Sequence, residues 1–259
     1  MIEQGRKVAL VTGAAGGIGA AIVRALAEQG VAVAALDRDK DRLNDSLAPL
    51  LDEGLAVSGF PTDVTSSAEV ADTVAGVESE LGPIDYLVNA AGVLRMGSVL
   101  SLTDQDWLDT FAVNANGVFY VSRAVVRGMI ARESGAIVTI GSNAAHTPRT
   151  EMAAYAASKA AVTLFTKSLG LEVAKYGIRC NLVAPGSTDT PMLSSMWHDE
   201  SGRQATIDGQ PAAYKLGIPL AKLAQPADVS DAVLFLLSDR AGHITLQELT
   251  VDGGATLGS

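Results

Sequence analysis

Short apolar runs recur along the chain, and longer segments with helical periodicity separate them. The runs are rich in Val, Ile and Ala, and Gly, Asn or Asp residues bound them. They are apolar throughout rather than alternating, which is typical of strands buried on both faces of a parallel sheet. We therefore expect strands at residues 8–12, 32–37, 56–60, 84–89, 136–141, 179–184 and 248–251.

The segments between these runs predict helices. Ser66 and Glu69 form a capping-box pattern at the start of one of them. Because strand and helix alternate, the sequence predicts one α/β domain over residues 1–259, a doubly wound parallel sheet with right-handed crossovers. Ligands bind such sheets at the carboxyl ends of the strands. Helices are expected at about residues 18–29, 66–82, 105–132 and 153–176.

Residues 187–217 interrupt this alternation. The segment is polar, lacks a clear period and contains Met192, Met196 and Trp197. Loops of this length in a compact domain are usually lids or disordered segments. Because methionine and tryptophan suit contact with a substrate, we expect an irregular lid over the ligand.

Charge and composition narrow the class of function. The 259-residue chain is 48% hydrophobic, so it can bury a large core, and its formal net charge is −10. No dense cluster of Lys and Arg is present, which argues against nucleic acid or an anionic membrane as a partner. The sequence has no apolar stretch long enough to span a membrane and no signal-peptide pattern, so we expect a cytoplasmic protein.

Metal and thiol chemistry are not expected. The sequence has three histidines and one cysteine, Cys180, which form no metal-binding pattern. Cys180 lies in an expected buried strand, so we interpret it as an inert core thiol in a reducing compartment.

A glycine-rich turn follows the first expected strand and leads into a helix. It contains Gly13, Gly17 and Gly19, with Ile18 between the last two. Glycines permit a tight turn, let the backbone approach a pyrophosphate and bring the helix against the strand. Since the N–H groups of the helix N-terminus then face the phosphates, the turn predicts a dinucleotide site.

The end of the second expected strand bears on the choice of cofactor. Asp37 stands there, and a carboxylate at this position accepts hydrogen bonds from the adenosine ribose and repels a 2′-phosphate. NAD is therefore favoured over NADP, although the neighbouring Arg38 could serve a phosphate. Asp63 and Val64 are candidates for the adenine edge, and Asn89 is a candidate to line the cofactor.

Tyr155 and Lys159 project from one face of an expected helix, because they are four residues apart. A protonated lysine favours the phenolate and can lower the tyrosine pKa from about 10 toward neutrality, as general acid/base chemistry requires. Ser142 could hold a substrate oxygen, and Asn114 could fix a water beside Lys159. Either could instead be a helix cap or a core polar group, but the four residues after a dinucleotide turn together indicate catalysis.

These residues together resemble the motif set of the classical short-chain dehydrogenases/reductases, which covers nearly the whole chain. The resemblance implies a Rossmann-like fold with a seven-stranded sheet and helices on both faces. It implies dimers or tetramers built from the two long helices, and we expect a homotetramer. The implied catalytic tetrad is Asn114, Ser142, Tyr155 and Lys159, and the implied cofactor contacts include Tyr155, Lys159, Pro185, Thr188 and Thr190.

A further set of segments lies outside these motifs: residues 94–97, 144–149, 186–190, 215–220, 243–247, 251–254 and 256–258. They resemble a branch of the family that oxidises a cyclohexadiene carboxylate. The implied reaction is NAD-dependent oxidation of the C3 hydroxyl of 2,3-dihydro-2,3-dihydroxybenzoate to 2,3-dihydroxybenzoate, in catechol siderophore biosynthesis. Arg149 or Arg95 could pair with the carboxylate, and Met192 and Trp197 could close over the ring, or each could be an ordinary surface or lid residue.

Three other functions stay open at this point. The same aromatising oxidation could act on 2,3-dihydro-3-hydroxyanthranilate, because nothing in the sequence separates an amine from a hydroxyl at C2. A 3-oxoacyl or ketone reductase would work in the opposite direction, but such enzymes commonly prefer NADPH, which Asp37 disfavours. A non-catalytic nucleotide-sensing scaffold would have no need of four intact catalytic residues.

Overall fold

Parallel strands form a seven-stranded central sheet in the order β3-β2-β1-β4-β5-β6-β9. The structure is a computed structural model that describes residues 6–197, 199 and 201–258. Each strand expected from the sequence is present with nearly the predicted bounds, which confirms the doubly wound parallel sheet. The strands are β1 (Val8–Thr12), β2 (Ala32–Asp37), β3 (Val57–Pro61), β4 (Tyr86–Asn89), β5 (Gly135–Ile140), β6 (Ile178–Pro185) and β9 (Glu248–Val251).

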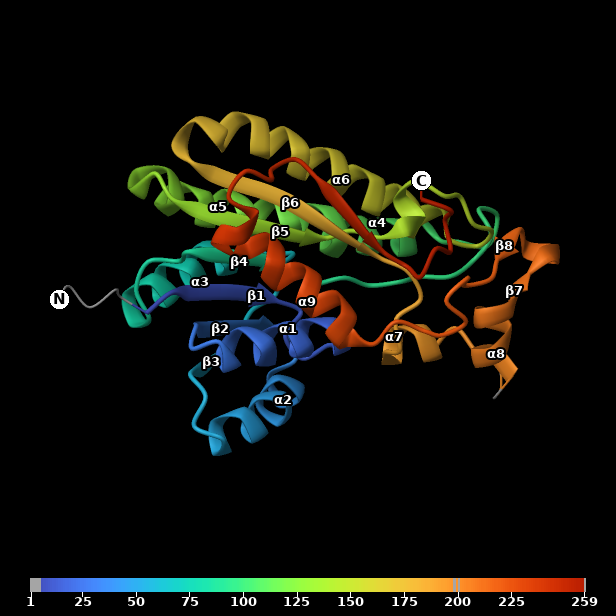
Figure 1. Ribbon diagram of the computed structural model, residues 1–259, viewed down its shortest axis with the longest axis horizontal. Helices are drawn as coiled ribbons and strands as arrows, with labels where there is room; N and C mark the ends of the chain where they lie inside the picture. The colour runs from blue at the N-terminus through green and yellow to red at the C-terminus, as the bar shows by residue number, and fades with distance from the viewer. Residues whose placement is uncertain (1–5, 198, 200, 259) are drawn as a thin grey trace.

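Helices bury both faces of the sheet, because alternate residues of each strand point to opposite sides. In β1, Ala9 and Val11 belong to one apolar core, while Val8 and Leu10 belong to the other. Figure 1 shows α5 and α6 along the upper side of the sheet and α1 and α2 along the lower side. One core includes α1 (Gly17–Glu28), α2 (Lys40–Asp52) and α9 (Pro226–Leu237); the other includes α3 (Ser67–Glu80), α5 (Val118–Arg132) and parts of α6 (Ala153–Val173).

Two of these helices, α2 and α9, lie where no helix was predicted from the sequence. In α2 the buried residues Leu43, Leu47 and Leu50 recur at helical spacing, but polar residues surround them. In α9, Pro226 occupies the first turn and a capping box joins Gln225 and Asp228. The signals for both helices were therefore present, but they were short.

The helix expected over residues 105–132 is interrupted. It consists of α4 (Asp104–Phe111), a π-helical segment η1 (Ala112–Gly117) and α5. The helix expected over residues 153–176 ends at Val173 and continues as the 3-10 turn η3 (Ala174–Tyr176). Such π segments lie frequently at functional sites, and sequence periodicity does not reveal them.

The capping box predicted at the start of α3 is half wrong. The Ser66 hydroxyl accepts a hydrogen bond from the Glu69 N–H, as expected. The Glu69 carboxylate, however, accepts the N–H of Asp63 rather than that of Ser66. The second hydrogen bond therefore fixes the loop after β3 against α3.

Residues 187–217 lie beyond the carboxyl ends of the strands, at the right of Figure 1, and the irregular structure predicted for them is wrong. Each element in the segment is too short to produce a visible period. Residues 198 and 200 of the predicted lid lie outside the described residues. The segment contains α7 (Pro191–Ser194), α8 (Ser201–Asp208), the 3-10 turn η4 (Pro211–Ala213) and an antiparallel pair, β7 (Gly209–Gln210) with β8 (Lys215–Leu216).

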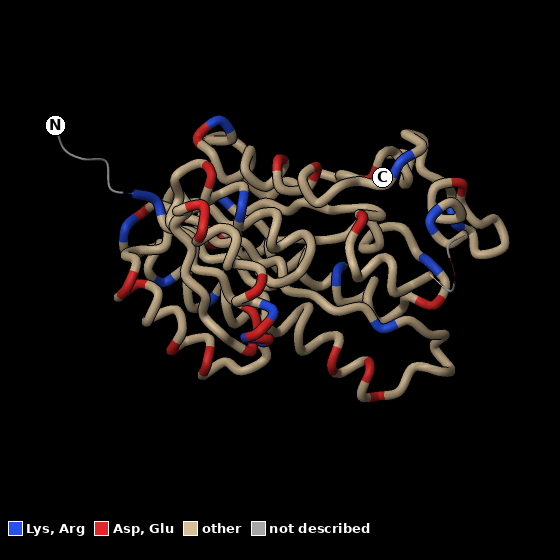
Figure 2. The backbone as a smooth tube through the Cα atoms, turned by 90° about the horizontal axis from the view of Figure 1, so that it is seen from below, with Lys and Arg blue, Asp and Glu red and all other residues tan. Residues whose placement is uncertain are grey.

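Short 3-10 turns follow two of the main elements, and charged residues are dispersed over the described chain. The 3-10 turns η2 (Asn143–Ala145) and η5 (Asp239–Ala241) follow β5 and α9. Figure 2 shows the Lys and Arg positions singly or in small groups among acidic ones. Among the described residues, no helix is long and apolar enough to cross a membrane.

Cys180 is fully buried, and burial raises the pKa of its thiol to about 12, which agrees with an inert core thiol.

Candidate active site

A cavity of about 880 Å³ opens at the carboxyl ends of the strands. Its walls are the glycine turn after β1, the loops after β4, β5 and β6, the start of α6, and the segment 187–217. The strands β1 and β4 are neighbours, and the sheet grows outward from them in both directions. Doubly wound sheets bind ligands at this switch point, so the cavity lies where the fold predicts a cofactor.

The glycine turn can hold its shape only without side chains. Gly13 has a φ of +67°, and a Cβ there would lie 2.7 Å from the Cα of Ala91. A Cβ on Gly19 would lie 2.1 Å from the carbonyl oxygen of Gly13. No side chain caps the start of α1, and Gly13, Gly17, Ile18 and Gly19 line the cavity. This arrangement fits a phosphate, because the first N–H groups of an uncapped helix need acceptors.

Asp37 borders the same cavity, and two backbone groups hold its carboxylate. Oδ2 accepts the N–H of Ala15 at 3.1 Å, and Oδ1 accepts the N–H of Asp39 at 3.1 Å. Arg38 and Arg42 also line the cavity. The end of the site near β2 therefore combines a fixed carboxylate with two guanidinium groups.

The other residues expected to contact a cofactor fall into two groups around the cavity. Asp63 and Val64 line it from the loop after β3, and the Asp63 carboxylate accepts the hydroxyl and the N–H of Thr65. Pro185, Thr188 and Thr190 line it beyond β6. Thr190 also caps α7, since its hydroxyl accepts the Leu193 N–H at 3.4 Å.

Tyr155, Lys159 and Ser142 line the cavity together. Tyr155 and Lys159 lie on successive turns of α6, and Ser142 directly follows Gly141 at the end of β5. The Lys159 nitrogen donates a hydrogen bond to the carbonyl oxygen of Ile140 at 2.8 Å, and a hydrogen bond joins the hydroxyls of Ser142 and Tyr155. A hydroxyl pair beside a buried amine can bind a carbonyl or alcohol oxygen and move its proton.

The electrostatics of Tyr155 differ from those expected. Burial raises the pKa of Tyr155 above its usual value, while the Ser142 hydrogen bond and the positive charge of Arg149 lower it in part. Burial lowers the pKa of Lys159 to about 8. Ser142 and Arg149 thus favour the phenolate, and the Lys159 nitrogen lies 5.8 Å from the centre of the Tyr155 ring.

Asn114 lies behind the cavity rather than on its wall. It is fully buried in the π-helical segment η1, where its Oδ1 accepts the Val93 N–H at 2.8 Å. Its Nδ2 donates to the Val93 carbonyl and to the Ser158 hydroxyl. The Asn114 amide and the Lys159 amine both approach Gly92, at 3.5 and 3.6 Å from the Cβ position. Asn114 therefore fixes the loop after β4 beside Lys159.

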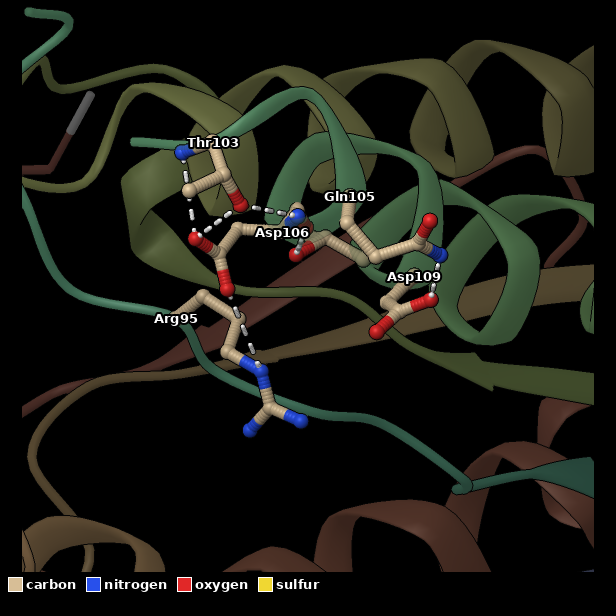
Figure 3. A network of polar contacts seen from close by, with 6 residues as sticks. Arg95, Thr103, Gln105, Asp106 and Asp109 are labelled. Carbon is tan, nitrogen blue, oxygen red and sulfur yellow. Dashed lines mark hydrogen bonds and ion pairs between the residues drawn. The ribbon is translucent and has the colours of Figure 1, made fainter. Parts of the chain in front are cut away.

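Two residues expected at the site lie outside it. Asn89 is buried and donates hydrogen bonds to the hydroxyls of Ser122 and Thr139, so it joins β4 to α5 and β5 instead of lining the cavity. Arg95 pairs with Asp106 on α4, with 3.9 Å between Nε and Oδ1, as Figure 3 shows. Arg95 does not line the cavity, whereas Arg149, the other arginine considered for the substrate carboxylate, does.

Three residues suggested for the substrate do line the cavity: Arg149, Met192 and Trp197. Trp197 is also held within the segment 187–217, because its indole nitrogen donates to the Thr206 hydroxyl at 3.2 Å. Asn143 and Thr256 line the cavity as well, and sequence reasoning missed them. For Asn143 the only available signal was its place directly after Ser142. Among the described residues, no cluster of three His, Cys, Asp or Glu side chains could hold a metal ion.

Comparisons with known proteins agree with this geometry. The chain matches the short chain dehydrogenase family pattern over residues 7–201. It is 56% identical over 252 residues to a 2,3-dihydro-2,3-dihydroxybenzoate dehydrogenase of Bacillus subtilis, and the match covers 97% of each chain. It is 44% identical over 249 residues to the enzyme of the same name from Escherichia coli, with 96% of each chain covered.

A solved structure gives the same result for the fold. A gluconate 5-dehydrogenase from Burkholderia cenocepacia, in complex with NADP and tartrate, matches with a TM-score of 0.89 at 34% identity, over 98% of this chain and 96% of that one. The chain therefore belongs to the short-chain dehydrogenase/reductase family. The predicted family, Rossmann-like fold and nicotinamide-dependent oxidoreductase class are confirmed.

Proposed function

We propose that the protein oxidises the C3 hydroxyl of 2,3-dihydro-2,3-dihydroxybenzoate with NAD and so produces 2,3-dihydroxybenzoate for catechol siderophores. The observation that carries the proposal is that Arg149 and Tyr155 line the same cavity and that the charge of Arg149 acts on the Tyr155 phenol. A ring carboxylate and a ring hydroxyl are the two groups that such a pair recognises. The names of the relatives from B. subtilis and E. coli supply the same substrate.

NAD is the proposed cofactor, and the glycine turn, Asp37 and the loop after β6 are its proposed contacts. The Asp37 carboxylate would accept hydrogen bonds from the adenosine ribose, with Asp63 and Val64 beside the adenine and with Tyr155 and Lys159 toward the nicotinamide ribose. The gluconate 5-dehydrogenase structure contains NADP, so the choice of NAD here rests on the residues at the end of β2 rather than on the fold. Asp37 favours NAD here because its carboxylate would repel a 2′-phosphate.

Each of these residues has a separate role in the proposed reaction. Arg149 pairs with the substrate carboxylate and directs the C3 hydroxyl toward Ser142 and Tyr155. Ser142 holds the hydroxyl oxygen, and the Tyr155 phenolate takes its proton as the C3 hydrogen departs with its electron pair. A bound nicotinamide supplies the acceptor for that hydride. Asn114 lies behind the cavity, where it fixes the loop 90–93. It also fixes a water beside Lys159, and the proton leaves through this water.

The product of this step is a cyclic enone, and proton transfer within the ring converts it to the aromatic catechol. Aromatisation makes the overall reaction nearly irreversible, so the protein need supply little of the driving force. Its main tasks are to orient the diol and exclude water. We propose that residues 187–217 form the lid that does this, with Met192 and Trp197 against the ring.

The test is NADH formation at 340 nm by the purified protein. Rapid turnover of 2,3-dihydro-2,3-dihydroxybenzoate with NAD, and much slower turnover with NADP, is the expected result. The same assay with 2,3-dihydro-3-hydroxyanthranilate measures the nearest rival. A preference for the amino compound would replace the proposed substrate, and no reaction with either compound would remove the proposed function altogether.

We further propose a homotetramer, whose contacts would involve the long helices. Large apolar side chains are exposed on these elements: Trp107 and Leu108 on α4, Phe119 on α5, and Leu164 and Leu171 on α6. Apolar groups of this size on one region of a surface are typical of protein interfaces. Light scattering after size-exclusion chromatography would give four times the chain mass of 26.6 kDa if the proposal holds.

A further inference from the structure

Arg149 is connected through one side chain to the C-terminal part of the chain. Its Nη2 donates a hydrogen bond to Oδ1 of Asn143 at 2.9 Å. The Nδ2 of Asn143 donates in turn to Oδ2 of Asp252 at 3.2 Å. Asn143 is 3% exposed and Asp252 is 8% exposed, so water competes little for either contact. The guanidinium, the amide and the carboxylate therefore form a relay whose amide and carboxylate are buried and whose guanidinium lines the cavity.

The order of these three groups fixes the orientation of the amide. With its present orientation the Asn143 oxygen faces a cation and its NH₂ group faces an anion. A flipped amide would present its NH₂ group to the guanidinium and its oxygen to the carboxylate, and both contacts would be repulsive. Arg149 and Asp252 thus hold the Asn143 amide in one orientation. In this orientation the amide oxygen in turn holds the Arg149 guanidinium.

The Asp252 end of the relay is well anchored. Oδ2 also accepts the hydroxyl and the N–H of Thr256, at 2.7 and 3.0 Å, and Oδ1 accepts the Gly254 N–H at 2.9 Å. Burial raises the pKa of Asp252, but its hydrogen bonds to Thr256, Asn143 and Gly254 outweigh that effect and lower the pKa overall. The group is therefore an anion at neutral pH.

Gly186 makes the close approach of Asn143 and Asp252 possible. A Cβ on Gly186 would lie 2.6 Å from Cβ of Asp252 and 3.2 Å from Nδ2 of Asn143. The relay therefore passes next to the end of β6, where Pro185 and Thr188 are proposed cofactor contacts. The relay also connects Asn143, the residue after Ser142, through Asp252 to Thr256, which lines the cavity.

Arg149 is the cation best placed for a ring carboxylate near Tyr155. The cavity is also lined by Arg38, Arg42, Lys159 and Lys215. Arg42 donates to the Ala15 carbonyl beside Asp37, and Lys159 donates to the Ile140 carbonyl. Arg149 lines the cavity, bonds no carboxylate directly among the described residues, and its positive charge lowers the pKa of the Tyr155 phenol in part. Its bond to Asn143 uses one of five N–H donors, which leaves capacity for a bidentate carboxylate contact.

We infer that Asn143 is the positioning residue of the carboxylate anchor: bonded to Asp252, it holds Arg149 at the angle at which the guanidinium meets the ring carboxylate. This inference rests on the proposed function for the identity of the ligand class. Asn143 lines the cavity, but its amide oxygen and nitrogen bond Arg149 and Asp252, so we expect it to act through Arg149. Its effect should therefore be confined to ligands that carry the carboxylate.

The experiment measures binding to the NADH complex by quenching of NADH fluorescence, with 2,3-dihydroxybenzoate and catechol as probes. Neither aromatic compound can react with NADH, so binding is separated from turnover. For Asn143→Ala we expect about tenfold weaker binding of 2,3-dihydroxybenzoate and catechol binding within twofold of wild type. Arg149→Met should give a larger loss, and the double variant should lose no more than Arg149→Met alone.

Asn181→Ala is the matched control. Asn181 is a fully buried asparagine whose amide bonds Ile244 and Gln247 ahead of β9, and it does not line the cavity. It should leave the ratio of the two affinities unchanged. If Asn143→Ala does not fold, the isosteric Asp252→Asn removes the anion from the same relay and should weaken carboxylate binding alone by a few-fold.

The outcomes separate the inference from the proposed function. The positioning role would be overturned if Asn143→Ala weakened the binding of both ligands equally or weakened neither. It would also be overturned if the loss of 2,3-dihydroxybenzoate affinity in the double variant were the sum of the two single losses. Failure of the wild-type complex to bind 2,3-dihydroxybenzoate more tightly than catechol would also overturn it. Selective binding without oxidation of the dihydrodiol would instead leave the relay standing and remove the proposed reaction.

Discussion

The side-chain nitrogen of Lys159 lies 5.8 Å from the centre of the Tyr155 ring. A hydrogen bond to the Ile140 carbonyl holds it at the end of β5. The amine is 5% exposed, and its burial lowers its pKa to about 8. A charged group placed in this way costs folding free energy, so the catalytic site and the stability of the protein are linked through Lys159.

The first prediction is that Lys159→Met stabilises the protein near neutral pH. The folded pKa of about 8 is below the usual 10.5, so below pH 8 the folded state carries the cost of a buried charge. Between pH 8 and 10.5 only the unfolded chain holds the proton, so the free energy of unfolding of wild type rises with pH. The gap between the folded and unfolded pKa values of Lys159 corresponds to about 3 kcal/mol of folding free energy. In the variant, loss of the hydrogen bond to the Ile140 carbonyl offsets about 1 kcal/mol of that gain.

Urea unfolding at equal protein concentration measures the effect. At pH 7 the variant should be more stable than wild type by about 1–2 kcal/mol, and by pH 10.5 the order should reverse. Lys175→Met replaces an exposed lysine on η3 and should show no such crossover. A constant difference between Lys159→Met and wild type across the pH range would contradict the prediction.

The second prediction concerns the proton acceptor. Tyr155→Phe removes one oxygen atom and leaves the ring in α6, so we expect NAD affinity within about threefold of wild type and a fall in kcat of about 100- to 10,000-fold. Tyr176→Phe makes the same chemical change on η3, outside the cavity, and should keep full activity. Stopped-flow NADH formation checks both, and a Tyr155→Phe variant within tenfold of wild type would remove Tyr155 from this role.

The third prediction concerns cofactor choice. Asp37→Ser removes the carboxylate that two backbone N–H groups fix at the end of β2 and leaves Arg38 and Arg42 in place. We expect kcat/KM with NAD to fall about 10- to 100-fold and kcat/KM with NADP to rise, because the guanidinium groups then face a 2′-phosphate without a competing anion. Asp45→Asn changes net charge equally on the exposed side of α2 and should alter neither value. An unchanged NAD preference in Asp37→Ser would show that another group reads the ribose.

Much of the fold could be predicted from the sequence because its strands are apolar on both faces. Runs such as Val8–Thr12 and Ala32–Asp37 have no other stable place than the middle of a covered sheet. The segment 187–217 could not be predicted in the same way. Its elements, such as α7 and β8, have four and two residues, so tertiary contacts rather than periodicity determine them.

The site shows the same division between local and non-local information. The glycine turn and the Tyr155–Lys159 spacing are local, and both lie at the cavity. The sequence offered both Arg149 and Arg95 for the carboxylate, with only the nearness of Arg149 to Tyr155 to separate them. In the structure Asp106 pairs with Arg95 outside the cavity, and Asn143 bonds Arg149 within it. Since Asn143 and Asp252 are more than a hundred residues apart in the chain, no spacing rule could reveal their contact.

The last prediction separates two costs of adding a side chain to a glycine. Gly30 and Gly13 both have positive φ, +81° and +67°, but nothing lies within 4 Å of a Cβ on Gly30, whereas backbone atoms of residues 90 and 91 lie within 3 Å of one on Gly13. Gly30→Ala should cost about 1–2 kcal/mol of stability from backbone strain and leave NAD binding unchanged. Gly13→Ala should cost more and weaken NAD binding at least tenfold, because the turn must move away from the loop after β4 to admit the methyl group. Thermal unfolding and NAD titration of the two variants check this, and equal effects on NAD binding would mean that close packing at Gly13 is not what shapes the phosphate site.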